Sequence, residues 1–593
     1  MKKIKIAILD SGVRKDHPAF SSKTINGFSL RVKEKYVERN EEFVDTLGHG
    51  TAVFYILDKF TENVEITNIK IYDKTTEITQ DDFEKLLNYI YHHYDYDIIN
   101  ISMGFLNCGS VVNLQKICDD FYTKGTLLIS AFDNNGAVSF PAGLNNVIGV
   151  DGQEKINSSN DYIYVENSII NIIGKLENFR VAWLKPDYII TKGNSFLCAK
   201  ITAKIAEYLQ QHESSDWEKI CIDKYIFEKT INNHISFTIQ KAAIFPFNKE
   251  IHAIARFEEL LNFEIINYYT ERITGYIGKK ISDILIDCDN NKVIKNIDDI
   301  NWDDFDTLIL GHIGELSRIT KRNYQYLINS AIEKGKNVYC FDNTKTISTR
   351  INELQYHNIY FPKINGTNIK KRFGKLYKTD KPILTIIGTN SRQGKFTLQL
   401  YIRKRLIELG YSVGQLGTEP SAPLFGFDEV FHCGYNGQID LDIPQIYIAV
   451  NDMIWNITQK DTDIIIVGTQ SGFLAYNDYN ALMFPTYHQI FFSALQTDAI
   501  ILCMNPYDDV EFVNRIIKVA EGLSGGKVIG IVCFPIDISD SWKGNFGMKM
   551  HLKKEKENEI KSNFASKGTQ VFMLDKSDEL NELIYKCIEY FQQ

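Results

Sequence analysis

The stretch IKIAILDSGV, residues 4–13, decides the fold of the first part of the chain. Apart from Lys5, residues 4–9 are all apolar. A short apolar run of this kind is typical of a buried strand. Asp10 follows the run directly, so we expect its carboxylate at the mouth of that strand.

Two further segments carry residue types that complete a hydrolytic centre. LGHGTAVF holds His49 between Gly48 and Gly50, and glycines let backbone and substrate approach closely. GNSFLCAKITAKIA holds Ser195 at the start of an expected helix. A serine hydroxyl is a poor nucleophile until an imidazole takes its proton, and the imidazole needs a carboxylate to fix its tautomer. The three segments together therefore predict nucleophilic hydrolysis by Asp10, His49 and Ser195.

A donor for the oxyanion is expected at Asn134, in LLISAFDNNGAVSFPAG. This asparagine follows a second apolar run, so its side-chain amide is placed to reach a developing negative charge. Losing one such donor costs roughly 3–4 kcal/mol of transition-state stabilisation. Asn134 is therefore the fourth residue predicted for the catalytic set.

These segments resemble the motifs of the subtilases, the subtilisin-like serine peptidases, across about residues 1–212. The chain order Asp, His, Ser is that of subtilisin itself. DSGVRKDHPAF resembles the family's aspartate motif, GHGTAV its histidine motif and GNSFLCAKITA its serine motif. IINISMG resembles the strand that binds the substrate backbone, and FPAG the turn after the oxyanion asparagine. The resemblance implies a subtilisin-like parallel-sheet domain with serine endopeptidase activity.

Several positions depart from the family pattern. Asn194 stands where the family has a threonine before the nucleophile. Cys198, Ala199 and Lys200 replace a small residue followed by Pro-His, and Asp133 replaces a glycine where negative charge should develop. These changes leave open a degenerate subtilase that only binds peptide. They also leave two interpretations of Cys198, a packing residue or a redox switch.

The whole chain has the composition of an ordinary globular protein. Its 593 residues are too many for one core and suggest about three domains. Apolar residues make up 44% and charged residues 24%, and the net charge of −9 gives no support for nucleic-acid binding. No apolar stretch approaches the ~20 residues of a membrane span, and no signal peptide precedes the first strand. We therefore expect a cytoplasmic protein made without a pro-segment, with neither membrane nor nucleic acid as partner.

The ten cysteines are scattered, with no CxxC pair and no Cys/His cluster. Several lie inside apolar runs, such as Cys503 in AIILCMN. They predict reduced core residues and no metal site.

The second half of the chain shows an alternation of strands and helices. Residues 213–240 are polar and irregular and predict a linker or connecting element. Residues 241–375 alternate apolar strands with helical stretches, which predicts a small Rossmann-like α/β domain. The segment KKRFGKLYKTDKP, 370–382, reads as a charged linker into a P-loop NTPase-like domain over 376–593.

The second chemical motif is KPILTIIGTNSRQGKFTLQLYIRKRL. A buried strand runs into Gly388, five residues follow, and Gly394-Lys395 opens a helix. Such a turn presents backbone N–H groups to phosphate oxygens, and the lysine adds a positive charge. The usual loop has four intervening residues, and here Phe396 takes the usual Ser/Thr position. The residues predicted to bind phosphate are Gly388, Thr389, Gly394, Lys395 and Thr397. The alternative is a glycine turn with an incidental lysine.

GTNSRQGKFT is similar to the loop of dethiobiotin-synthetase-like P-loop enzymes, and closer still to a bacterial family linked with N-acyl amino acid racemisation. That resemblance covers about 241–593 and implies ATP or another nucleotide, with Mg, as cofactor. Val467 stands where the family ends its second strand with a glutamate. Metal coordination would then have to come from Glu419, Asp428 or Thr397, so phosphate binding is favoured over fast hydrolysis.

Together these features predict a cytoplasmic subtilisin-like endopeptidase fused to a nucleotide-binding module. A dedicated role in maturing a peptide precursor is one reading of this architecture, with a peptide or protein as substrate. A second reading is an ATP-dependent ligase or amino-acid-modifying enzyme whose subtilase half only binds peptide. A third is a nucleotide-gated sensor protease in stress or phage defence. The oligomeric state is left open.

Overall fold

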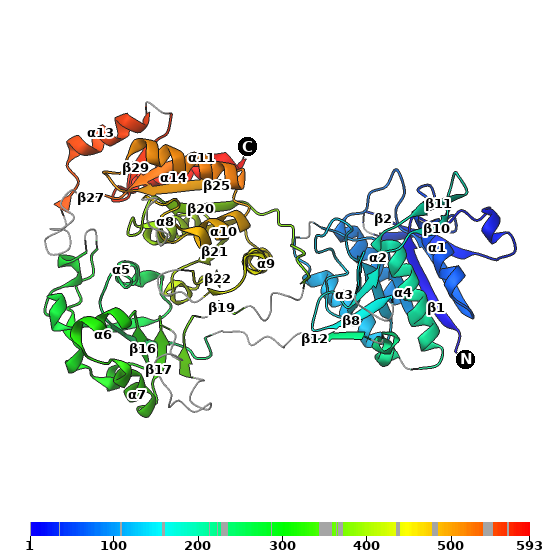
Figure 1. Ribbon diagram of the computed structural model, residues 1–593, viewed down its shortest axis with the longest axis horizontal. Coiled ribbons are helices and arrows are strands. Elements are labelled where there is room, and N and C mark those ends of the chain that lie inside the picture. Colours follow the sequence, from blue (N-terminus) through cyan, green and yellow to red (C-terminus); the bar gives the residue numbers. More distant parts are fainter. Residues whose placement is uncertain are drawn as a thin grey trace. The chain divides into compact units, whose positions relative to one another are not determined.

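The computed structural model separates into two compact units, one containing Met1–Thr230 and Thr367–Asp380, the other Ile231–Gly366 and Lys381–Gln593 (Figure 1). The residues that the structure describes are 2–34, 36–106, 109–156, 161–212, 214–221, 223–226, 235–285, 288–342, 358–362, 364–365, 372–433, 439–476, 484–537, 550–565 and 568–592. The segment 367–380, predicted to span the end of the Rossmann-like domain and the start of the P-loop domain, groups with the first unit. The other predicted boundaries stay predictions, and part of the expected linker at 213–240 lies outside the described residues.

The first unit is built on a ten-stranded sheet with the order β12-β8-β9-β7-β6-β5-β1-β4-β2-β3. Its pairs are parallel except β2 with β3 and β8 with β9. The strands are β1 Ile4–Asp10, β2 Asn26–Lys33, β3 Tyr36–Asn40, β4 Val64–Lys70, β5 Ile98–Ile101, β6 Leu127–Ala131, β7 Val147–Gln153, β8 Tyr162–Glu166, β9 Ile172–Lys175 and β12 Asp223–Ile226. A separate hairpin joins β10 Phe179–Ala182 to β11 Tyr188–Thr191. The apolar run before Asp10 is confirmed as a strand, paired on one side with β4 and on the other with β5.

Four helices of this unit are α1 His49–Phe60, α2 Gln80–His93, α3 Val112–Lys124 and α4 Asn194–Leu209. Helices α1 and α4 share one core cluster with β1, to which Ala52 and Ala203 contribute small side chains. Small residues let two helices approach each other and the sheet closely. This packing fixes the first turns of α1 and α4, where His49 and Ser195 stand.

The second unit holds two parallel sheets, ordered β15-β14-β13-β16-β17-β18 and β22-β21-β24-β20-β25-β26-β29. The first contains β13 Lys241–Phe245, β14 Glu264–Thr270, β15 Lys295–Asn296, β16 Thr307–Leu310, β17 Asn337–Cys340 and β18 Ile359–Tyr360. The second contains β20 Ile383–Gly388, β21 Val413–Gly417, β22 Glu429–Val430, β24 Ile464–Gly468, β25 Ala499–Met504, β26 Lys527–Cys533 and β29 Val571–Met573. Short pairs join β19 Ile364–Asn365 to β23 Ile439–Asp440, and β27 Ile536–Asp537 to β28 Met550–His551. The predicted α/β class with parallel sheets is confirmed.

The helices described for this unit are α5 His252–Arg256, α6 Gly314–Thr320, α7 Gln325–Glu333, α8 Lys395–Glu408, α9 Ile443–Thr458, α10 Thr486–Ala494, α11 Val510–Ser524, α13 Lys554–Ala565 and α14 Ser577–Gln592. Strand β20 lies between β24 and β25, and Leu384 and Ile386 share a core cluster with Leu398 and Ile402 of α8. The loop 389–394 therefore leaves the carboxyl end of a central strand and enters α8 directly.

Within the described parts of the chain, no helix combines the length and apolar character needed to cross a bilayer. The cysteines in those parts are all unpaired thiols, as the scattered spacing predicts.

Candidate active site

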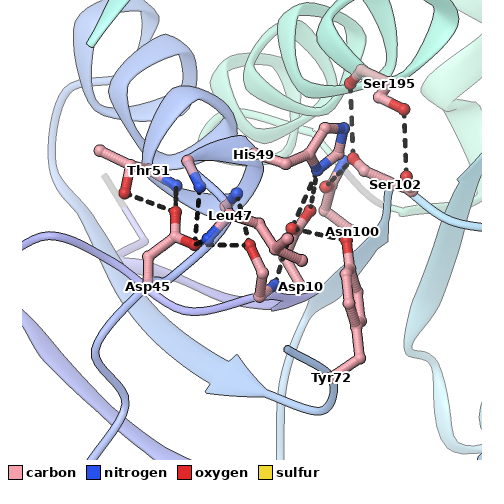
Figure 2. Close-up of polar contacts among 12 residues, drawn as sticks. Asp10, Asp45, Leu47, His49, Thr51, Tyr72, Asn100, Ser102 and Ser195 are labelled. Carbon is pink, nitrogen blue, oxygen red and sulfur yellow. Dashed lines mark hydrogen bonds and ion pairs between the residues drawn. The ribbon is translucent and has the colours of Figure 1, made fainter. Parts of the chain in front are cut away.

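Asp10 ends β1 and is almost fully buried. The Nδ1 atom of His49 lies 2.9 Å from its Oδ1 and 3.0 Å from its Oδ2 (Figure 2). A carboxylate can only accept, so Nδ1 carries the proton and Nε2 is the basic nitrogen. Oδ1 also accepts from the backbone N–H of Ser11 at 2.7 Å and from the hydroxyl of Tyr72 at 3.0 Å. The structure thus brings two predicted residues together and adds Tyr72, which no sequence motif indicated.

The environment of His49 makes it a stronger base than an ordinary histidine. Burial disfavours the charged ring, but the neighbouring carboxylate of Asp10 and its hydrogen bond outweigh burial. Asp45 acts in the same direction at longer range, and the net result is a raised pKa for His49. The imidazole remains 26% exposed, so one edge is open to a ligand.

Asp45 organises the turn that leads into α1, a role that the motif reading missed. Its carboxylate accepts from the Ser11 hydroxyl at 2.9 Å and from the backbone N–H groups of Leu47, Gly48 and Thr51 at 2.8, 2.9 and 2.9 Å. The Thr51 hydroxyl adds a bond of 2.6 Å. A negative charge suits the unpaired N–H groups at a helix start. The one signal in the sequence is an acidic residue four positions before His49.

Ser195 lies in the first turn of α4, with its hydroxyl donating to the carbonyl of Ser102 at 3.0 Å. The Ser102 hydroxyl in turn donates to Asn100 Oδ1 at 3.0 Å (Figure 2). The hydrogen bonds of the described residues do not include one between Ser195 and His49. A rotation about the Cα–Cβ bond of Ser195 is needed to present Oγ to the imidazole, and ligand-free sites often hold such bonds open.

Asn134 follows β6 and has an exposed side chain. Its Oδ1 accepts from the backbone N–H of Asn194 at 2.8 Å, so the amide nitrogen is the end left for a ligand oxygen. The unusual carboxylate of Asp133 accepts from the backbone N–H of Asn135 at 2.6 Å. The Asp133 carboxylate is thus hydrogen-bonded within its own turn.

The side chain of Asn194 ties the start of α4 to β6 and β7. Its Nδ2 donates to the carbonyls of Phe132 and Asp133 at 3.0 and 3.2 Å, and to Asp151 Oδ1 at 3.0 Å. A Cβ at Gly152 would lie 2.7 Å from Asn194 Oδ1, so the close approach depends on that glycine. Asn194 therefore has a definite structural role where the family has threonine.

The residues after Ser195 that depart from the family pattern also have defined surroundings in the structure. Cys198 is buried, with Asn100 Nδ2 at 3.4 Å from its sulfur, and burial raises the pKa of its thiol to about 12. A thiol of that kind is unreactive, which favours the packing interpretation. Lys200 Nζ lies 2.6 Å from Glu177 Oε1.

In the second unit, the glycine-bounded loop folds around its lysine. Lys395 Nζ donates to the carbonyl of Asn390 at 2.7 Å, and burial lowers the pKa of this amine to about 8. Gly394 has φ 76°, and a Cβ there would lie 2.4 Å from a Leu574 side-chain atom. A Cβ at Gly388 would lie 3.0 Å from Lys395 Nζ. The positive φ of Gly394 and the close approach to Leu574 make glycine necessary there for the loop shape.

Thr389 and Gln393 brace the loop from within. The Thr389 hydroxyl donates to Asp508 and accepts from Gln393 Nε2, while Gln393 Oε1 accepts from the N–H of Asn390 at 3.0 Å. Thr397 is half-buried in the first turn of α8. The loop, the first turn and the ammonium group of Lys395 fit a phosphate group. Asp508 comes from a distant loop that no sequence pattern marked.

The proposed substitutes for the missing glutamate differ in their surroundings. Asp428 accepts from the Gln415 N–H at 2.8 Å and pairs with Lys460, so its oxygens are occupied. Glu419 is half-buried, and the loss of solvent around its carboxyl group raises the pKa of that group. Among the described residues, no group of three His, Cys, Asp or Glu side chains is arranged to hold a metal ion.

Two family models match two separate stretches of the chain, one with the predicted catalytic residues and one with the predicted phosphate-binding loop. Residues 1–243 match the model of the subtilase family, Peptidase_S8. The first part of the chain is therefore a subtilase domain. Residues 370–531 match a model described as the P-loop domain of a domain of unknown function, DUF1611_C. The second half thus carries a P-loop domain of the DUF1611 kind, and the closer resemblance to dethiobiotin synthetases stays a prediction.

Among curated proteins, "Subtilisin-like protease SBT6.1" of Arabidopsis thaliana is 28% identical over 162 residues, which are 25% of this chain and 14% of that protein. "Thermophilic serine proteinase" of Bacillus sp. (strain AK1) is 25% identical over 30% of this chain and 47% of its own. "Major intracellular serine protease" of Bacillus subtilis (strain 168) is 21% identical over 40% and 78%. The chain spans less than half the length of the first two relatives.

Two solved structures are among those similar to parts of the chain. A DUF1611 family protein from Anabaena variabilis has a TM-score of 0.40 at 14% identity and covers 58% of this chain and 99% of its own. A lanthipeptide protease has a TM-score of 0.30 at 17% identity, with 36% and 78% covered.

Proposed function

We propose that the first unit is a serine endopeptidase in which Ser195 is the nucleophile. The observation that carries this proposal is the buried pair of Asp10 and His49, with Nδ1 held on the carboxylate and a raised pKa for the ring. A buried carboxylate in this position fixes the tautomer that a general base needs. Four residue types of one mechanism, contributed by four different segments, converge at one end of one sheet.

In this mechanism Ser195 Oγ leaves the Ser102 carbonyl and turns toward His49 Nε2. Oγ attacks the scissile carbonyl carbon while its proton passes to Nε2, and the Asp10 carboxylate stabilises the imidazolium that forms. The carbonyl oxygen becomes an oxyanion, which accepts from Asn134 Nδ2 and from backbone N–H groups at the start of α4. His49 then gives the proton to the leaving amine, and a water activated by the same ring hydrolyses the acyl-enzyme.

We further propose that the substrate is a restricted set of peptides inside the cell, such as a precursor cut once during maturation. The similarity to an intracellular Bacillus protease supports the location. An active subtilase among cellular proteins requires narrow selection, since broad cleavage would damage its host. A peptide or protein substrate is consistent with the family of the first domain.

A second function, nucleotide binding, is favoured by the loop from Gly388 to Lys395. The buried amine of Lys395 and the N–H groups at the start of α8 suit the phosphates of ATP or another nucleotide, taken as its Mg complex. If the P-loop domain were the catalytic part, as an ATP-dependent ligase or an amino-acid-modifying enzyme, the subtilase domain would only bind peptide. If it sensed nucleotide, it would gate the peptidase.

A fluorophosphonate probe tests the peptidase proposal directly. The probe reacts with a serine that a neighbouring base activates, so we expect labelling of the purified protein and none in Ser195→Ala. Peptide mapping should find the adduct on Ser195. A wild-type protein that stays unlabelled while folded would overturn the proposal and favour the peptide-binding alternative.

A further inference from the structure

A segment predicted to be a charged linker lies on the subtilase domain. The backbone N–H of Val138 donates to the carbonyl of Leu376 at 3.0 Å. The rings of Phe140 and Tyr377 stack at 6.1 Å with an interplanar angle of 8°. Both contacts fall on residues 138–140, a few positions after Asn134. The chain thus returns to the oxyanion side of the first unit after completing the Rossmann-like part of the second.

Within this segment, Lys375 is buried and forms an ion pair with Asp151. The two atoms, Nζ and Oδ1, lie 3.1 Å apart, and each side chain is only 8% exposed. The ammonium group also lies 5.6 Å from the centroid of the Phe132 ring, a cation–π arrangement. Removing one partner of such a pair leaves an uncompensated buried charge, which is strongly unfavourable.

Asp151 connects this lysine to the catalytic set through one residue. The same Oδ1 that faces Lys375 accepts from Asn194 Nδ2 at 3.0 Å. Asn194 stands directly before Ser195, and its backbone N–H holds Asn134 Oδ1 at 2.8 Å. The side-chain amide of Asn194 has two protons for three acceptors, and the charged acceptor, Asp151 Oδ1, is the atom that also pairs with Lys375.

We propose that Lys375 is a positioning residue of the peptidase: through Asp151 and Asn194 it orients the oxyanion amide of Asn134 and the start of α4. The subtilase match ends at residue 243, so this residue comes from chain well beyond the family domain. The inference rests on the proposed function and deepens it. It makes the segment that carries Lys375, which groups with the first unit, a support of the peptidase site.

The test is a double-mutant cycle in the full-length chain, read by the rate and the concentration dependence of fluorophosphonate labelling. Lys375→Met should lower the maximal labelling rate about tenfold, because a displaced oxyanion donor stabilises the transition state less. Half-saturation by the probe should not change. Lys378→Met removes an equal charge from an exposed position of the same segment and should label like the wild type.

Asp151→Asn should also slow labelling, and the double variant should be no slower than the slower single one, since both act through one contact. If Lys375→Met does not fold, the labelling rates of Asp151→Asn and of the double variant are compared instead. Equal rates of these two proteins support the proposal. A wild-type rate in Lys375→Met, or losses that multiply in the double variant, would overturn it. Absence of labelling in the wild type would overturn the proposed function as well, so the two failures are distinguishable.

Discussion

Tyr72 donates its hydroxyl hydrogen bond to Asp10 Oδ1, at 3.0 Å, beside the imidazole that the same oxygen holds at 2.9 Å. The proximity of Asp10, after burial itself, raises the pKa of this phenol above its ordinary value, so the hydroxyl keeps its proton and stays a donor. A buried carboxylate with several donors is held in one orientation. Tyr72 therefore helps to set the geometry of the Asp10–His49 pair.

Tyr72→Phe should slow fluorophosphonate labelling severalfold and lower the free energy of unfolding by about 1 kcal/mol, the worth of one hydrogen bond. Labelling kinetics and denaturant unfolding measure the two effects. Tyr122→Phe removes a hydroxyl from an exposed tyrosine of α3 and serves as the control. An unchanged labelling rate in Tyr72→Phe would show that Asp10 is held without it.

Labelling should depend on pH through His49. Only the neutral ring can accept the serine proton, so the rate rises as pH increases through the pKa of His49. Because Asp10 raises that pKa, the midpoint in the wild type should lie above the ordinary value of 6.5. Asp10→Asn removes the raising charge, so its much slower reaction should show a midpoint at lower pH. A pH–rate profile of both proteins tests this, and coincident midpoints would contradict the assigned pair.

Asp45→Asn should be strongly destabilising. The substitution removes the charge that holds three backbone N–H groups and two hydroxyls, so we expect a loss of about 3 kcal/mol in the free energy of unfolding. Denaturant unfolding measures it. Glu42→Gln, the same change at an exposed position in that loop, should cost little. An equal loss of unfolding free energy in the two variants would contradict the role assigned to Asp45.

Local sequence carries the parts of this site that depend on short-range pattern. A stretch of about ten residues is enough to recognise the apolar run of β1, the glycines around His49 or the helix after Ser195. The α/β fold and the residue set could therefore be predicted. Tyr72 and Asp45 could not be assigned roles, because their partners are fixed by strand pairing and loop packing. Lys375 is the extreme case, since a charged segment rich in Lys has the composition of a solvated linker, and only the structure shows that Lys375 pairs with Asp151.

Nucleotide binding should depend on the charge of Lys395. Burial lowers the pKa of this amine to about 8, so it loses its proton as pH rises through that value. A bound phosphate stabilises the ammonium form, and binding is therefore expected to take up protons near pH 8 and to weaken at higher pH. Isothermal titration with ATP and Mg in buffers of different ionisation enthalpy measures the proton uptake. Lys395→Ala should abolish both binding and uptake, whereas Lys404→Ala, on an exposed turn of the same helix, should retain them. Equal binding by wild type and Lys395→Ala would show that the loop is only a structural turn.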